Sequence, residues 1–121
     1  YKPLLMDVLT APSPDCYQRE PGESWEAHSL RQFAHMERLL AEHAHELAAV
    51  IVEPLVQCAA GMRMYHPVYL GRLRDACTRY GVHLIADEIG AGFGRTGTMF
   101  ACEQAAISPD FLCVSKGLTG G

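Results

Sequence analysis

One short stretch constrains the fold more than any other, His83-Leu84-Ile85-Ala86-Asp87-Glu88. It begins as an apolar run, which follows Gly81 and precedes a glycine-rich stretch that starts at Gly90, so it is typical of a buried strand. The strand ends in two acidic residues, and a buried carboxylate needs a partner because loss of water penalises its charge. The candidate cation is Lys116, which follows a second apolar run, residues 111–115.

The rest of the chain divides into alternating helical and extended patterns. Ser24 is a plausible N-cap, and Gly81 is the expected C-cap of a helix that has Pro67 in its first turn. Apolar residues at helical spacing separate the strands, and prolines dominate the beginning of the chain. The predicted elements are an irregular lead-in (1–23), a helix (25–47), a strand (48–54), a loop (55–64), a helix (67–80), a strand (82–87), a short helix (99–106) and a strand (110–114).

Three mostly apolar strands joined by helices predict an α/β fold with a mostly parallel sheet that helices cover on both faces. Ligands of such sheets bind at the carboxyl ends of the strands. Here those ends carry Glu53, Asp87-Glu88 and Lys116. We therefore expect a polar site at one edge of the sheet.

Length and composition narrow the class of protein. The 121 residues are the length of about one domain, yet the chain starts at Tyr1 and stops at Gly120-Gly121, so we expect a fragment, with residues 24–121 as a partial domain truncated at both ends. A net charge of -4, with no run of basic residues, gives no support for nucleic-acid binding. No transmembrane stretch or signal peptide is recognisable.

The cysteines are odd in number and widely spaced, which disfavours a disulfide framework or a zinc site. We expect small core residues in a reducing compartment, and the cytoplasm is the predicted location. No metal site is predicted.

Lys116 and Asp87 each admit two interpretations. A lysine at a strand end in apolar surroundings can be neutral enough to attack a carbonyl and form a Schiff base, or it can form an ordinary ion pair with Asp87 or Glu53. Asp87 could hold the pyridinium nitrogen of pyridoxal phosphate protonated, or it could cap the glycine-rich loop. Glu88 follows Asp87 directly and should point the opposite way.

The segment Gly92-Phe93-Gly94-Arg95-Thr96-Gly97 matches the G-x-G-x-x-G pattern of dinucleotide binding. The acids that precede it would oppose a phosphate, and only a short segment separates it from Pro109. A tight loop that lets Arg95 face a pocket is therefore favoured. Arg95 could bind a substrate carboxylate with two parallel hydrogen bonds, or it could simply be solvated.

Taken together, several motifs resemble the class III pyridoxal-phosphate-dependent aminotransferases, over about residues 9–121. The motifs are Val52-Glu53-Pro54-Leu55-Val56-Gln57, Ala86-Asp87-Glu88-Ile89, Gly92 to Gly97, Ser108-Pro109-Asp110 and Ser115-Lys116. The resemblance implies the large domain of the fold-type-I aminotransferases, with pyridoxal 5'-phosphate as cofactor. It implies that Lys116 binds the cofactor covalently and moves the substrate proton, and that Asp87 pairs with the pyridine nitrogen. Arg95 and Glu53 would border the substrate.

Within the family, residues 61–67, 100–103 and 116–121 are most similar to members that act in biotin biosynthesis. This resemblance implies transfer of the amino group of S-adenosylmethionine to 8-amino-7-oxononanoate, which gives 7,8-diaminononanoate. It also implies small-molecule substrates and a homodimer when full length, with the fragment alone inactive. The alternatives are a class III aminotransferase for ω-amino acids and a non-catalytic nucleotide-binding module.

Four positions depart from the family pattern. Cys58 and Ala60 stand where glycines are usual, which is expected to tighten their loop. Gly90 stands where many members have glutamine and the biotin enzymes have a small residue, and Gly117 replaces a common alanine.

Overall fold

Three parallel strands form the central sheet of the computed structural model, which describes residues 2–121. They are β1 (Ala49–Val52), β4 (His83–Asp87) and β5 (Phe111–Cys113), in the order β1-β4-β5. Both neighbouring pairs are parallel. The predicted α/β class and the three predicted strands are confirmed, and the acid-terminated strand β4 is the middle one.

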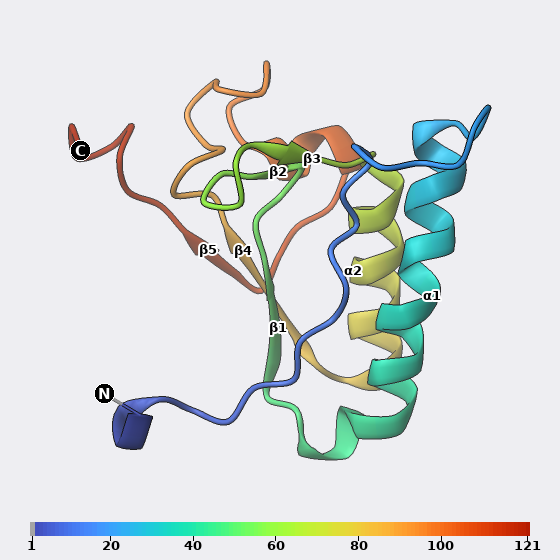
Figure 1. The fold of residues 1–121 in the computed structure, drawn as a ribbon. Helices are drawn as coiled ribbons and strands as arrows, with labels where there is room; N and C mark the ends of the chain where they lie inside the picture. The colour runs from blue at the N-terminus through green and yellow to red at the C-terminus, as the bar shows by residue number, and fades with distance from the viewer. Residues whose placement is uncertain (1) are drawn as a thin grey trace.

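Two helices, α1 (Trp25–His43) and α2 (Val68–Tyr80), lie side by side on one side of the sheet (Figure 1). The Ser24 hydroxyl accepts a hydrogen bond from the Ala27 N–H at 3.1 Å, which confirms the predicted N-cap. Gly81 ends α2 in the left-handed conformation at φ 69°, which confirms the predicted C-cap. The helix α1 is shorter than predicted, because its last turn tightens into a 3-10 helix, Ala44–Glu46.

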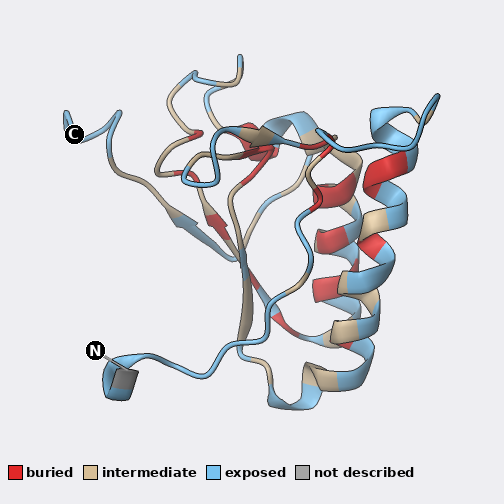
Figure 2. Cartoon of the chain, in the orientation of Figure 1, coloured by how far each residue is buried: buried red, intermediate tan, exposed pale blue. Residues whose placement is uncertain are grey.

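The hydrophobic core lies between these helices and one face of the sheet (Figure 2). Leu84 and Ala86 of β4 are buried, as are Leu40 of α1 and Leu73 of α2. The opposite face carries the row Ile51–Ile85–Phe111, with Ile51 63% and Phe111 55% exposed. Residues 2–121 thus supply helices to one face only, whereas the sequence predicted cover on both.

The predicted loop 55–64 is instead a small antiparallel hairpin of β2 (Val56–Gln57) and β3 (Arg63–Met64). Leu55 has φ 62°, a left-handed conformation that turns the chain sharply after β1. The Tyr65 hydroxyl then donates to the Glu53 carbonyl at 2.7 Å and joins the hairpin to the strand end. Sequence periodicity missed this hairpin because its strands are only two residues long.

The predicted helix at 99–106 is a 3-10 helix, Ala101–Ala105. Ala106 ends it in the left-handed conformation, at φ 52°. The chain then enters β5, so the connection between β4 and β5 is mostly loop.

Residues 2–23 of the lead-in are irregular, as predicted, apart from a 3-10 turn at Lys2–Leu4. The lead-in is nevertheless fixed to the fold, because Cys16 is fully buried and its N–H donates to the Met64 carbonyl at 2.8 Å. The buried His28 ring of α1 contacts the Asp15 carbonyl through Nε2 at 2.9 Å. The lead-in therefore joins α1 to the hairpin.

All five cysteines are free thiols. Cys16, Cys77 and Cys102 are buried core residues, as predicted, whereas Cys58 and Cys113 are only partly buried. Burial raises the pKa of Cys77 to about 11 and that of Cys102 to about 12. In the described part of the chain, no helix has the length and apolarity needed to cross a membrane.

Candidate active site

The carboxyl ends of β1, β4 and β5 lie at the same edge of the sheet, beside the β2–β3 hairpin (Figure 1). Glu53 follows β1 directly, and Asp87 is the last residue of β4. Asp87 is in register with Cys113 of β5, and Lys116 lies three residues beyond Cys113. The structure thus brings Glu53, Asp87 and Lys116 to one edge.

The adjacent acids Asp87 and Glu88 have different environments. Glu88 is fully buried, and its two oxygens accept hydrogen bonds from the Ala101 and Cys102 N–H groups, both at 2.8 Å. Asp87 is partly buried, and its Oδ1 accepts from the Ile89 N–H at 3.0 Å. Within residues 2–121, Asp87 Oδ2 has no hydrogen-bond partner. Glu88 thus holds the short helix in place, while Asp87 leaves one oxygen without a hydrogen-bond partner in residues 2–121.

This use of Glu88 argues against a nucleotide-binding role for Gly92–Gly97. In dinucleotide-binding folds, the glycine-rich turn leads into a helix whose free N–H groups bind the pyrophosphate. Here the helix that follows has five residues, and the Glu88 carboxylate already occupies two of its first N–H groups. The glycines instead form turns, with φ 89° at Gly94 and φ 103° at Gly97.

Lys116 lies in a tight turn just after β5. The Gly120 N–H donates to the Lys116 carbonyl at 2.8 Å, and the Leu118 N–H donates to the Ser115 carbonyl at 2.9 Å. Lys116 has φ 35°, a backbone conformation that is costly for a residue with a side chain and is often retained at functional sites. The lysine is exposed, and it forms no ion pair with Asp87 or Glu53, so the structure does not show the alternative of an ordinary ion pair.

Gly90 approaches both the hairpin and the lysine. A Cβ atom at this position would lie 2.6 Å from Cys58 Sγ and 3.7 Å from Lys116 Nζ. The first distance is too short for any side chain at position 90 as long as Cys58 keeps its place. Two departures from the family pattern, Cys58 and Gly90, therefore fall on a single contact beside the lysine.

A similar contact explains Gly117. A Cβ atom there would lie 2.9 Å from the Cβ of Phe93, in the glycine-rich loop. The common alanine would not fit beside Phe93 without a shift of one backbone segment. The sequence singled out Gly117 as a departure, but only the structure shows that Phe93 requires it.

Glu53 holds the loop that carries Cys58, since its Oε2 accepts a hydrogen bond from the Cys58 N–H at 2.8 Å. Burial and the charge of Glu53 raise the pKa of the Cys58 thiol, against smaller opposing effects of Lys116 and Arg95. Cys58 thus lies among three predicted site residues. Arg95 is exposed and makes no ion pair with any residue in the range 2–121.

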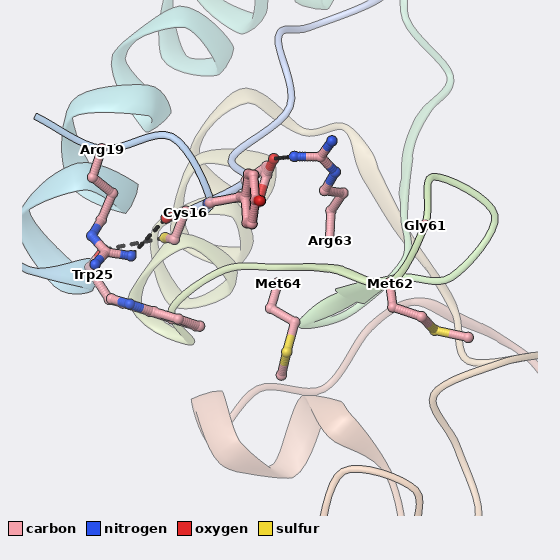
Figure 3. Close-up of a pocket in the computed structure, with 9 residues that line it drawn as sticks. Cys16, Arg19, Trp25, Gly61, Met62, Arg63 and Met64 are labelled. Carbon is pink, nitrogen blue, oxygen red and sulfur yellow. Dashed lines mark hydrogen bonds and ion pairs between the residues drawn. The ribbon is translucent and has the colours of Figure 1, made fainter.

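A cavity of about 580 Å³ lies elsewhere, between the lead-in, Trp25 and the hairpin (Figure 3). Its two arginines already have partners. Arg19 lies 5.5 Å from the centre of the Trp25 ring, and Arg63 Nη1 pairs with Asp15 Oδ2 at 2.9 Å. None of the residues that line this cavity is a predicted site residue, so it does not extend the site. Residues 2–121 contain no group of three or more metal-ligating side chains arranged for a metal ion.

Comparisons with known proteins agree with this fold. The model of the family "Aminotransferase class-III" matches residues 1–121. Adenosylmethionine-8-amino-7-oxononanoate aminotransferases from Nitratidesulfovibrio vulgaris and Helicobacter pylori are 51% and 46% identical over the whole chain. The chain spans 22% and 26% of their respective lengths.

Solved structures show the same fold. A transaminase solved with L-alanine has a TM-score of 0.83 at 35% identity, over 98% of the chain and 28% of its own. The ω-transaminase from Pseudomonas jessenii in complex with PMP has a TM-score of 0.78 at 36% identity, over 91% of the chain and 24% of its own. The fold is therefore that of a transaminase. The chain belongs to the class III aminotransferase family.

Proposed function

We propose that the protein containing this segment is a pyridoxal-phosphate-dependent aminotransferase of biotin biosynthesis, which transfers the amino group of S-adenosylmethionine to 8-amino-7-oxononanoate. The names of relatives that are 51% and 46% identical over the full segment support this substrate pair. Residues 24–121 would form the central part of the cofactor domain, preceded by the lead-in 1–23. A cytoplasmic homodimer with small-molecule substrates is part of the same proposal.

One observation carries the proposal, namely an unpaired lysine and a half-satisfied carboxylate at adjacent strand ends. Lys116 has no ion-pair partner in the described segment, and Asp87 keeps one oxygen free of hydrogen bonds there. An amine suits the aldehyde of pyridoxal phosphate, and a carboxylate suits its ring nitrogen. The residues present therefore fit the cofactor, which when bound supplies an electron sink for the substrate carbanion.

Asp87 and Lys116 would have different roles in transamination. Asp87 would hold the proton on the ring nitrogen, since an ionised carboxylate beside that nitrogen favours its charged form. Lys116 Nζ would hold the cofactor covalently until the amino donor displaces it. The released amine would then act as a general base that moves the proton between the substrate α-carbon and the cofactor.

Arg95 and Glu53 are proposed to act at the substrate side of the site. The exposed guanidinium of Arg95 could pair with a substrate carboxylate. Glu53 is only partly buried, and one of its oxygens already holds the Cys58 N–H. Its action on substrate would therefore come through the loop that carries Cys58.

A second candidate is an aminotransferase for ω-amino acids. The similarity to solved ω-transaminase structures at 36% identity favours it. The two candidates differ in the amino donor. Full-length enzyme that converts 8-amino-7-oxononanoate with S-adenosylmethionine but not with an ω-amino acid would support the first, and the reverse result would support the second.

The first test is covalent mapping on the full-length protein. Pyridoxal phosphate is added, the complex is reduced with borohydride, and the modified lysine is located by mass spectrometry. We expect the adduct on Lys116, its loss in Lys116→Ala, and its retention in Lys2→Ala, which removes the other lysine of the segment. A folded protein without an adduct on Lys116 would contradict the proposed function.

A further inference from the structure

Cys58 is the residue next to Lys116 that the proposed chemistry does not yet use. Its sulfur and the lysine amine both border the space where a side chain at position 90 would begin, at 2.6 Å and 3.7 Å from that point. Because residue 90 is glycine, the Cys58 side chain takes this space instead. The wall of the site beside the Lys116 amine is therefore formed by Cys58 of the hairpin, and not by residue 90 of the loop after β4.

The position of Cys58 is fixed by its surroundings. Its N–H donates to Glu53 Oε2 at 2.8 Å, and its thiol lies 3.7 Å from the Val56 carbonyl as a weak donor. Leu55 and Val56, which precede it, are buried. Because the Cys58 backbone is held, its Cβ atom would stay 3.2 Å from a Cβ at position 90 even if the thiol rotated, so a methyl group there meets a tight contact.

We propose that Cys58 is a positioning residue for the Lys116 amine, and that Cys58 and Gly90 form a reciprocal pair in which only one position can carry a side chain. The pair sets how much room a group attached to Lys116 Nζ has on that side. The part of this inference that concerns a group on Lys116 rests on the proposed function, whereas the reciprocity rests on the contact alone.

Exchange of the two side chains tests the reciprocity in the full-length protein. Gly90→Ala places a methyl group against the sulfur, so we expect the unfolding midpoint to fall by roughly 3 °C or more. Adding Cys58→Gly removes the obstacle, and the double variant should recover most of that loss. A double variant no better than Gly90→Ala would overturn the reciprocal pair.

Thiol labelling tests the position of Cys58 relative to the amine. N-Ethylmaleimide is added to the full-length protein with and without pyridoxal phosphate reduced onto it, and the rate at Cys58 is followed by mass spectrometry. We expect loading to slow labelling of Cys58 at least about tenfold, as the wall of an occupied site would be shielded. In Lys116→Ala, treated in the same way, the rate should not change.

The outcomes separate the two proposals. An adduct on Lys116 with no change in Cys58 labelling would overturn the positioning role and leave the proposed function standing. Absence of any adduct on Lys116 would contradict the proposed function, and the exchange variants would then decide the reciprocity by the unfolding midpoint alone. A thiol that only packs the hairpin, away from the group attached to Lys116, would show no protection that depends on Lys116.

Discussion

The helical side of the molecule and the carboxyl edge of its sheet differ in their ion pairs. On the helical side, three arginines form short ion pairs, namely Arg31–Glu23 and Arg74–Asp110 at 2.8 Å and Arg79–Glu37 at 2.6 Å. Arg38 of α1 and Arg72 of α2 form none within residues 2–121. At the sheet edge, Lys116 and Arg95 have no ion pair within residues 2–121. The ion pairs fasten elements together, a role that Lys116 and Arg95 do not have within residues 2–121.

The two regions also differ in backbone strain. The helices carry regular caps, whereas Lys116 and Phe93 have left-handed backbones at φ 35° and φ 58°. Such residues are costly and persist only where the surroundings fix them. Two of the left-handed residues thus lie in the loops around the candidate site, while Leu55 and Ala106 adopt the same conformation where they turn the chain after β1 and after the 3-10 helix.

Replacement of Lys116 is expected to have the largest effect on activity and little effect on stability. Lys116→Ala should abolish transamination by the full-length protein, because the amine that binds the cofactor and moves the proton is lost. The free energy of unfolding of the cofactor-free protein should change by less than about 0.5 kcal/mol, as an exposed side chain without ion pairs contributes little. Activity assays and urea unfolding of the same preparation measure both. A large loss of stability would contradict the division between the two regions.

Shortening a core side chain tests the helical side of the molecule. Leu73 is fully buried between α2 and the sheet, so Leu73→Ala should cost about 2–5 kcal/mol of unfolding free energy, through lost burial and a cavity. Urea unfolding of the full-length protein measures this cost. Leu118→Ala, at a 62% exposed leucine near Lys116, is the matched control and should cost less than about 0.5 kcal/mol. Equal costs would show that the turn after β5 is as tightly packed as the core.

The two neighbouring acids provide a comparison within one strand end. Glu88→Gln should lower stability by roughly 2 kcal/mol, because an amide can satisfy only one of the two buried N–H groups that Glu88 binds. Asp87→Asn keeps an acceptor for the Ile89 N–H, so stability should be nearly unchanged. Activity should fall, because the amide lacks the charge proposed to hold the proton on the ring nitrogen. Unfolding and activity measurements on both variants check this. Reversed effects would exchange the roles of the two acids.

The smallest expected effect concerns the ion pair between Glu23, just before α1, and Arg31 of α1. The hydrogen bond from Arg31 lowers the pKa of Glu23 from its usual 4.5 to about 2. Because the folded-state pKa is the lower one, the stabilisation is present above pH 4.5 and is lost as the pH falls toward 2. Glu23→Gln should therefore lower the urea midpoint at about pH 6, and this difference should shrink by about pH 3. Glu20→Gln is the control, with little expected difference at either pH.

Much of the site was predictable because its residues follow strands. The apolar runs that end in Asp87 and Lys116 identified two neighbouring parallel strands, and parallel pairing alone brings their ends together. The period of a strand also predicted that Glu88 would point away from Asp87. Its partners, the N–H groups of Ala101 and Cys102, were not predictable, since loop geometry decides where they lie.

The sequence by itself determined the α/β class, the helix caps and the order of the polar strand ends, because these depend on local periodicity and on single residues such as Ser24 and Gly81. Only the tertiary structure decided that Gly90 meets Cys58 and that Gly117 meets Phe93. The first contact joins segments separated by β3, α2 and β4, and the second joins segments separated by the 3-10 helix and β5. Periodicity describes one element at a time. Close packing between elements decides which small residues cannot be replaced by larger ones.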